Sequence, residues 1–78
     1  MSNFDDLETM IEILGLAIAR QEAEEQFFRR SARASSDEMA KSLFTEIADD
    51  MKKYVKNLEQ RKRKLDDALV ALTAEEKK

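Results

Sequence analysis

Two polar side chains interrupt an apolar stripe in the first half of the chain. Gln21 and Glu25 occupy positions where the spacing of the stripe predicts apolar residues. Polar groups on the buried face of a helix cost free energy unless they are hydrogen-bonded, so the interruption indicates either a site or a bonded polar layer. The acidic residues nearby are Glu22, Glu25, Asp49 and Asp50. If two chains aligned so that Glu25 and Asp50 of both came together, their oxygen atoms would form a cluster suited to Ca²⁺, Mg²⁺ or Mn²⁺. Acids on helix flanks are, however, ordinarily solvated.

Other reactive groups are few. The chain has no Cys and no His, and Gly15 is the one glycine, so we expect neither nucleophilic catalysis nor a phosphate-binding loop. A basic stretch does occur, made of Lys52, Lys53, Lys56 and the run Arg61 to Lys64. Nucleic-acid binding through this stretch is an alternative, but four consecutive helical residues point all round a helix. Pairing with acids of the first half is the simpler interpretation.

Two helices must position these residues. The first is predicted over about 4–33 by apolar residues at alternating steps of three and four. The second is predicted over about 36–65, where Ser35 and Glu38 match a capping box, with a possible short C-terminal extension. Because Arg61 and Lys62 interrupt the stripe there, we expect the tight packing to end near them. We therefore assign one domain to 1–72 and a polar, frayed tail to 73–78.

The linker between the helices is too short to separate two domains, so they must fold back as an antiparallel hairpin. A chain of 78 residues with no disulfide rarely stabilises itself by more than about 3–5 kcal/mol. The apolar stripe of the first helix is also wide enough to face more than one neighbour. We therefore expect an all-α hairpin that pairs into an antiparallel four-helix bundle with a second copy or with another subunit.

The composition limits the possible environments. The N-terminus lacks the basic and then apolar pattern of a signal peptide, and no apolar run approaches the roughly 20 residues of a membrane span. The net charge of −3 favours neither nucleic acid nor an anionic membrane. We expect a cytoplasmic protein with no membrane partner.

The segments around the interruption resemble the rubrerythrin-like branch of the ferritin-like superfamily. The resemblance covers about residues 14 to 60 and is carried by three features: the pair Phe27-Phe28, the run from Phe44 to Asp50 with Ile47-Ala48-Asp49-Asp50, and the separation between them. It implies a four-helix bundle with a di-metal site, built from one Glu on each of two helices and a Glu-x-x-His on each of the others.

The residues that match those ligand positions are unsuited to that chemistry. Gln21 stands at the position of the lone Glu, and Met51 and Tyr54 stand at the Glu-x-x-His positions. A neutral amide, a thioether and a phenol supply no carboxylate bridge for hard iron ions. We therefore expect these side chains to fill the space of the metal site, with the Tyr54 hydroxyl free to bond Gln21 or Glu25.

These observations predict a non-catalytic association module, homodimeric or docked as an accessory subunit, with no cofactor and no catalytic residue. The alternatives are a metal-binding ferritin-like oxidase or storage protein that uses iron or manganese, and a small nucleic-acid-binding protein. The expected interface residues share the apolar stripes of the two helices: Leu7, Ile11, Leu14, Ile18, Phe28, Leu43, Phe44, Ile47, Met51, Tyr54 and Leu58.

Overall fold

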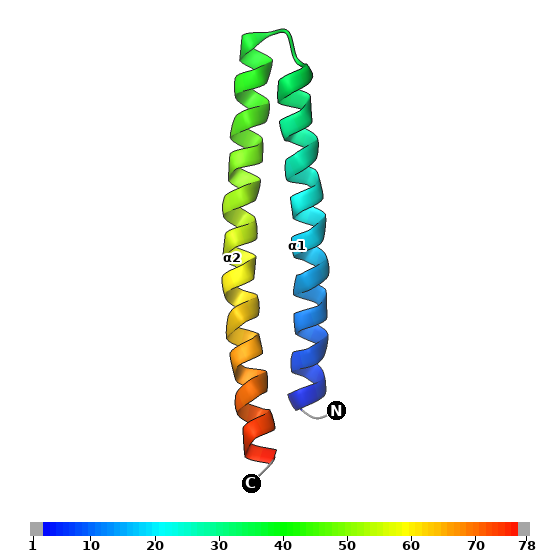
Figure 1. The fold of residues 1–78 in the computed structure, drawn as a ribbon, viewed down its shortest axis with the longest axis vertical. Coiled ribbons are helices and arrows are strands. Elements are labelled where there is room, and N and C mark those ends of the chain that lie inside the picture. The colour runs from blue at the N-terminus through cyan, green and yellow to red at the C-terminus, as the bar shows by residue number, and fades with distance from the viewer. Residues whose placement is uncertain (1–2, 77–78) are drawn as a thin grey trace.

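Two long α-helices joined by residues 35–37 make up the structure, a computed structural model that describes residues 3–76 (Figure 1). Helix α1 spans Asn3–Ala34 and helix α2 spans Glu38–Glu76. They run antiparallel and side by side, with both termini at one end (Figure 1). The Cα atoms extend over 62 × 17 × 14 Å, so the molecule is a rod two helices wide. The predicted hairpin is confirmed.

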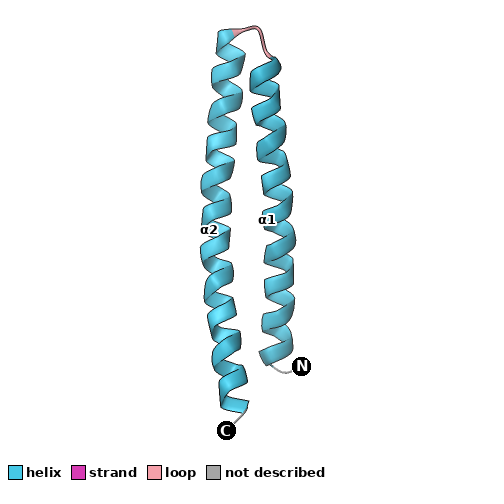
Figure 2. Ribbon diagram, in the orientation of Figure 1, coloured by secondary structure: helices cyan, strands magenta, loops and turns pink. Residues whose placement is uncertain are grey.

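The connection between the helices is short (Figure 2), and its residues cap both helix ends. The Ser35 hydroxyl donates to the Ser31 carbonyl at 2.8 Å, and the Ser35 N–H reaches the same carbonyl at 3.1 Å. The Met39 N–H donates to Asp37 Oδ1 at 3.0 Å, which makes Asp37 the N-cap of α2. The predicted Ser35–Glu38 capping box is therefore wrong, since Ser35 bonds the end of α1 instead.

The helices meet along a seam whose positions alternate in steps of three and four, the repeat of a coiled coil. Every seam residue in this register is buried or half-buried. On α1 these are Phe4, Leu7, Ile11, Leu14, Ile18, Gln21, Glu25, Phe28 and Ala32, and on α2 they are Phe44, Ala48, Met51, Val55, Leu58, Lys62, Leu65, Leu69 and Leu72. The rings of Phe28 and Phe44 lie 6.0 Å apart between centroids, so these two seam positions meet across the helices.

The seam on α2 differs by one position from part of the predicted stripe. Ala48, Val55 and Leu58 are its most buried residues, at 0%, 6% and 7% exposure. Leu43 and Tyr54 are 54% and 53% exposed in the hairpin, so they do not belong to this seam. The physical reason is the alternating spacing of the seam. Steps of four, three and four from Phe44 lead to Ala48, Met51 and Val55, so Leu43 and Tyr54, one position before seam residues, turn outward.

The second helix is also longer than predicted. It continues without a break beyond residue 65 to Glu76, and Leu65, Leu69 and Leu72 remain half-buried. Lys62 does not end the seam, because its chain lies along the groove and its ammonium reaches Asp66 Oδ2 at 3.4 Å. The tail predicted over 73–78 is helical as far as residue 76, and 77–78 lie outside the described residues. Within the described chain, neither helix has a stretch long and apolar enough to cross a membrane.

Candidate functional site

Glu25, one of the two polar residues that interrupt the seam, belongs to an ion-paired layer. It lies in the seam, and its side chain is only 13% exposed. Arg29 Nε donates to Glu25 Oε2 at 2.8 Å, and Arg29 Nη2 donates to Asp49 Oδ1 at 3.2 Å. Both hydrogen bonds raise the pKa of Arg29 above its ordinary value, and the one to Glu25 has the larger effect. A cation whose pKa rises on folding contributes below its unfolded pKa, so this layer stays paired throughout the neutral range.

Arg29 therefore supplies the hydrogen-bond partner that the half-buried Glu25 needs. It neutralises the half-buried carboxylate from one turn away and links it to the second helix. The i,i+4 spacing of Glu25 and Arg29 was readable in the sequence, but the bridge to Asp49 depends on how the helices are aligned. The ion pair accounts for the half-buried Glu25 and joins the two helices through Asp49, whereas Gln21 is not part of it.

The three residues at the suspected ligand positions are only partly brought together. Gln21 and Met51 are half-buried in the seam, whereas Tyr54 lies outside it. Among the described residues, no hydrogen bond joins the Tyr54 hydroxyl to Gln21 or Glu25. An amide, a thioether and a phenol in this arrangement do not match the carboxylate and imidazole set that iron takes in such bundles.

The remaining acids do not gather within one chain. Glu22 and Asp50 are exposed, while Glu25 and Asp49 are joined through Arg29. Over residues 3–76, no group of three or more His, Cys, Asp or Glu side chains is placed to hold a metal ion. A cluster shared between two chains, as in the calcium, magnesium or manganese alternative, lies beyond what one hairpin contains.

The side chains of the basic run on α2 differ in where they lie and in how exposed they are. Lys62 lies in the seam, and Arg61, Arg63 and Lys64 are exposed around it. Arg61 and Lys64 border a hollow of ≈ 470 Å³ on one side of the hairpin, together with Met10, Ile13, Leu14 and Leu65. The run therefore does not form a single basic surface, as expected for consecutive helical residues.

The hairpin has two different long sides. One, which we call the charged side, carries the Arg29–Asp49 ion pair and the approach of Lys62 to Gly15. The other, which we call the apolar side, carries the hollow that spans both helices. The apolar residues of this second side flank the seam at steps of three, four, seven and ten: Met10, Ile13, Ala17 and Phe27 on α1, and Leu43, Ile47 and Tyr54 on α2.

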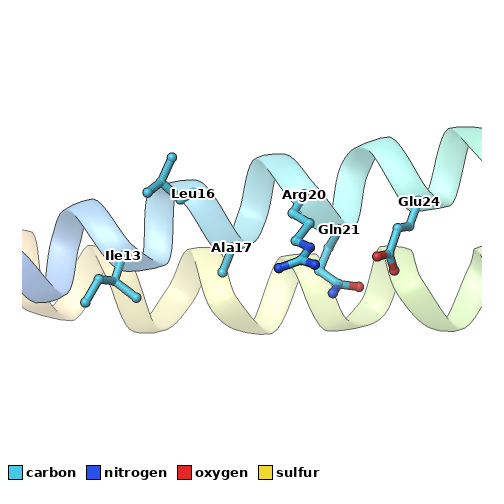
Figure 3. A pocket seen from close by; sticks show the side chains of 6 residues that line it. All are labelled: Ile13, Leu16, Ala17, Arg20, Gln21 and Glu24. Carbon is cyan, nitrogen blue, oxygen red and sulfur yellow. The ribbon is translucent and has the colours of Figure 1, made fainter.

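A second hollow of ≈ 470 Å³ lies farther along the apolar side (Figure 3). Its lining comes from α1 alone and combines Ile13, Leu16 and Ala17 with Arg20, Gln21 and Glu24. Ala17 and Gln21 extend from α1 toward α2, and Leu16 points away (Figure 3). The hollow is open to solvent along its length, so it is a groove between side chains and not an enclosed ligand cavity.

The two rings of the aromatic pair have different surroundings. Phe28 packs in the seam against Phe44, while Phe27 is 56% exposed on the apolar side and meets Phe28 edge to face with centroids 5.3 Å apart. The sequence identified the pair but placed only Phe28 in an interface. The signal for Phe27 was the second apolar spacing from Met10 through Ile13 and Ala17, one position away from the seam.

Comparison of the chain with protein families, with curated proteins and with solved structures finds no match.

Proposed function

We propose that this chain is a non-catalytic association module of the ferritin-like kind, which uses its apolar side to complete a four-helix bundle with another chain. Its partner is a second copy or the larger assembly to which it belongs as a small subunit. The single observation that carries the proposal is the distribution of large apolar side chains. Among the described residues three hydrophobic ones are buried, whereas eight large ones are exposed: Met10, Ile13, Leu16, Phe27, Met39, Leu43, Tyr54 and Val70.

Scattered apolar residues on a surface need no explanation, but these are concentrated. Five of the eight, Met10, Ile13, Phe27, Leu43 and Tyr54, belong to the apolar side, and Leu16 adjoins it in the hollow of Figure 3. Large exposed apolar side chains that gather on one side of a protein mark an interaction site. Val70 and Met39 lie apart from it and carry no part of the argument.

The chemistry of the seam supports a role without catalysis. Its one carboxylate, Glu25, is held by Arg29, and the other polar residue near it is the amide of Gln21. The sequence offers no thiol and no imidazole to act as nucleophile or base. The polar groups at this level are suited to aligning helices.

The proposal is tested by the size of the protein in extracts of its own cells. We expect the chain to elute from a sizing column in an assembly larger than one hairpin, and the variant Phe27→Glu/Leu43→Glu to elute as a single hairpin. Charges placed on a buried apolar contact cost several kcal/mol, by order of magnitude.

A matched control adds the same two charges one residue earlier in each helix. Gln26→Glu and Ser42→Glu change exposed positions on the charged side, so the assembly should persist. If the unmodified chain elutes as a lone hairpin, or if both variants behave alike, association through the apolar side is wrong.

A further inference from the structure

We infer that the apolar side is covered by a second copy of this same chain, packed face to face as an isologous dimer. This rests on the proposed function and identifies the partner. Three features of the apolar side favour a copy over an unrelated protein: its shape, its area and its mixture of charges.

The shape requires a long, straight partner. The apolar residues extend from Met10 to Phe27 on α1 and are bordered by Leu43 and Tyr54 on α2, so the contact surface is two helices wide and many turns long. A pair of antiparallel helices of the same length fills such a surface and gives the ordinary four-helix bundle. This chain itself is such a pair, and the same patch on both partners is what a two-fold interface needs.

The area agrees with a stable dimer. Cα extents of 62 by 17 Å give the broad face of the hairpin about 1,000 Å², compared with about 800 Å² buried per partner in a typical specific interface. The apolar residues from Met10 to Phe27 would form the centre of this interface, and the polar residues on either side of them its rim, so a copy that covered most of the length would bury a sufficient surface. A short peptide would leave much of the apolar side in water.

The charges on this side suit a copy of itself. Arg20 and Glu24 of α1 border the hollow in Figure 3, and Arg61 and Lys64 of α2 border the other one. Arg20 and Glu24 are opposite charges one turn apart on the same helix and border the same hollow.

A partner of a single charge would meet repulsion somewhere on this mixed surface. When α1 of a copy lies antiparallel over α1, a two-fold axis that passes between Arg20 and Glu24 places Arg20 of each copy opposite Glu24 of the other. Opposite charges at the rim favour this pairing over strongly acidic or basic partners such as nucleic acid.

The test uses the purified full chain and two variants of opposite charge. In the acidic variant Ile13 and Phe27 are both replaced by Glu, and in the basic variant both are replaced by Lys. Sedimentation of the unmodified chain over a range of concentrations should show a dimer that dissociates on dilution. For each variant alone we expect the dissociation constant to rise at least about 100-fold, since two buried anchors are lost and like charges meet.

Mixing equal amounts of the two variants is the decisive step. Their charges are complementary only if one copy lies on another, so the mixture should regain a dimer, and circular dichroism should show helix content equal to that of the unmodified chain. Recovery from the mixture also covers the case in which either variant alone loses its fold. The matched control places Glu or Lys at Ala19 and Gln26, exposed positions off the apolar side, and should leave the dimer intact.

Three results would overturn the inference: an unmodified chain that stays monomeric at all concentrations, a mixture that does not recover the dimer, or control variants that dissociate it. A purified monomer beside a large assembly in cell extracts would refute the second copy and leave the proposed function standing. Single hairpins in both experiments would refute both.

Discussion

Replacing Gly15 by Ala should make the protein more stable, because this glycine sits inside α1 without a conformational need for it. It lies in the middle of a continuous helix, and it does not have a positive φ. A methyl group at Gly15 would meet only the Cε atom of Lys62, at 3.9 Å, which is an ordinary van der Waals contact. The substitution therefore removes backbone freedom from the unfolded chain without forcing any neighbour to move.

The expected gain follows from helix propensity. Alanine is favoured over glycine in a helix interior by about 0.8–1.0 kcal/mol. For a domain of this length a change of 1 kcal/mol shifts the melting temperature by roughly 4–8 °C. Gly15 faces the charged side with Lys62, so the substitution leaves the apolar side unchanged.

The assay is thermal and urea unfolding followed by circular dichroism at one fixed protein concentration. Ala19→Gly is the matched control, because Ala19 is exposed one turn farther along the same helix. It should lower the free energy of unfolding by about the amount that Gly15→Ala raises it, roughly 1 kcal/mol. A stability loss for Gly15→Ala, with the expected loss for Ala19→Gly, would refute the reasoning and mean that another backbone approaches Gly15 in the assembled protein.

Three further substitutions test the seam and the connection by the same unfolding assay. Leu58→Ala removes one of the most buried side chains and should cost about 2–5 kcal/mol, and an unchanged midpoint would mean that the seam is misplaced. Asp37→Ala removes the acceptor of the Met39 N–H and should cost about 0.5–2 kcal/mol, whereas Ser36→Ala should have little effect. Lys62→Leu should stabilise the chain by roughly 1 kcal/mol, since its side chain is only 34% exposed and its pairing with Asp66 is a weak surface contact; destabilisation would show that the seam requires a cation there.

The sequence by itself determined the hairpin. Two periodic runs, the absence of Pro and a connection too short for anything but a reversal leave few other arrangements. It also located the polar interruption at Gln21 and Glu25. These features depend on local spacing, which is read directly from the chain.

Only the tertiary structure decided which neighbouring stripe lies between the helices. The apolar residues of α2 form two neighbouring stripes, and either could pack against α1. With Phe28 in contact with Phe44, the stripe that contains Val55 is buried and Tyr54 is exposed. The same alignment joins Arg29 to Asp49, a pair 20 residues apart. Periodicity indicates that a helix has an apolar face, but how that face divides between α1 and a partner depends on how the two helices dock.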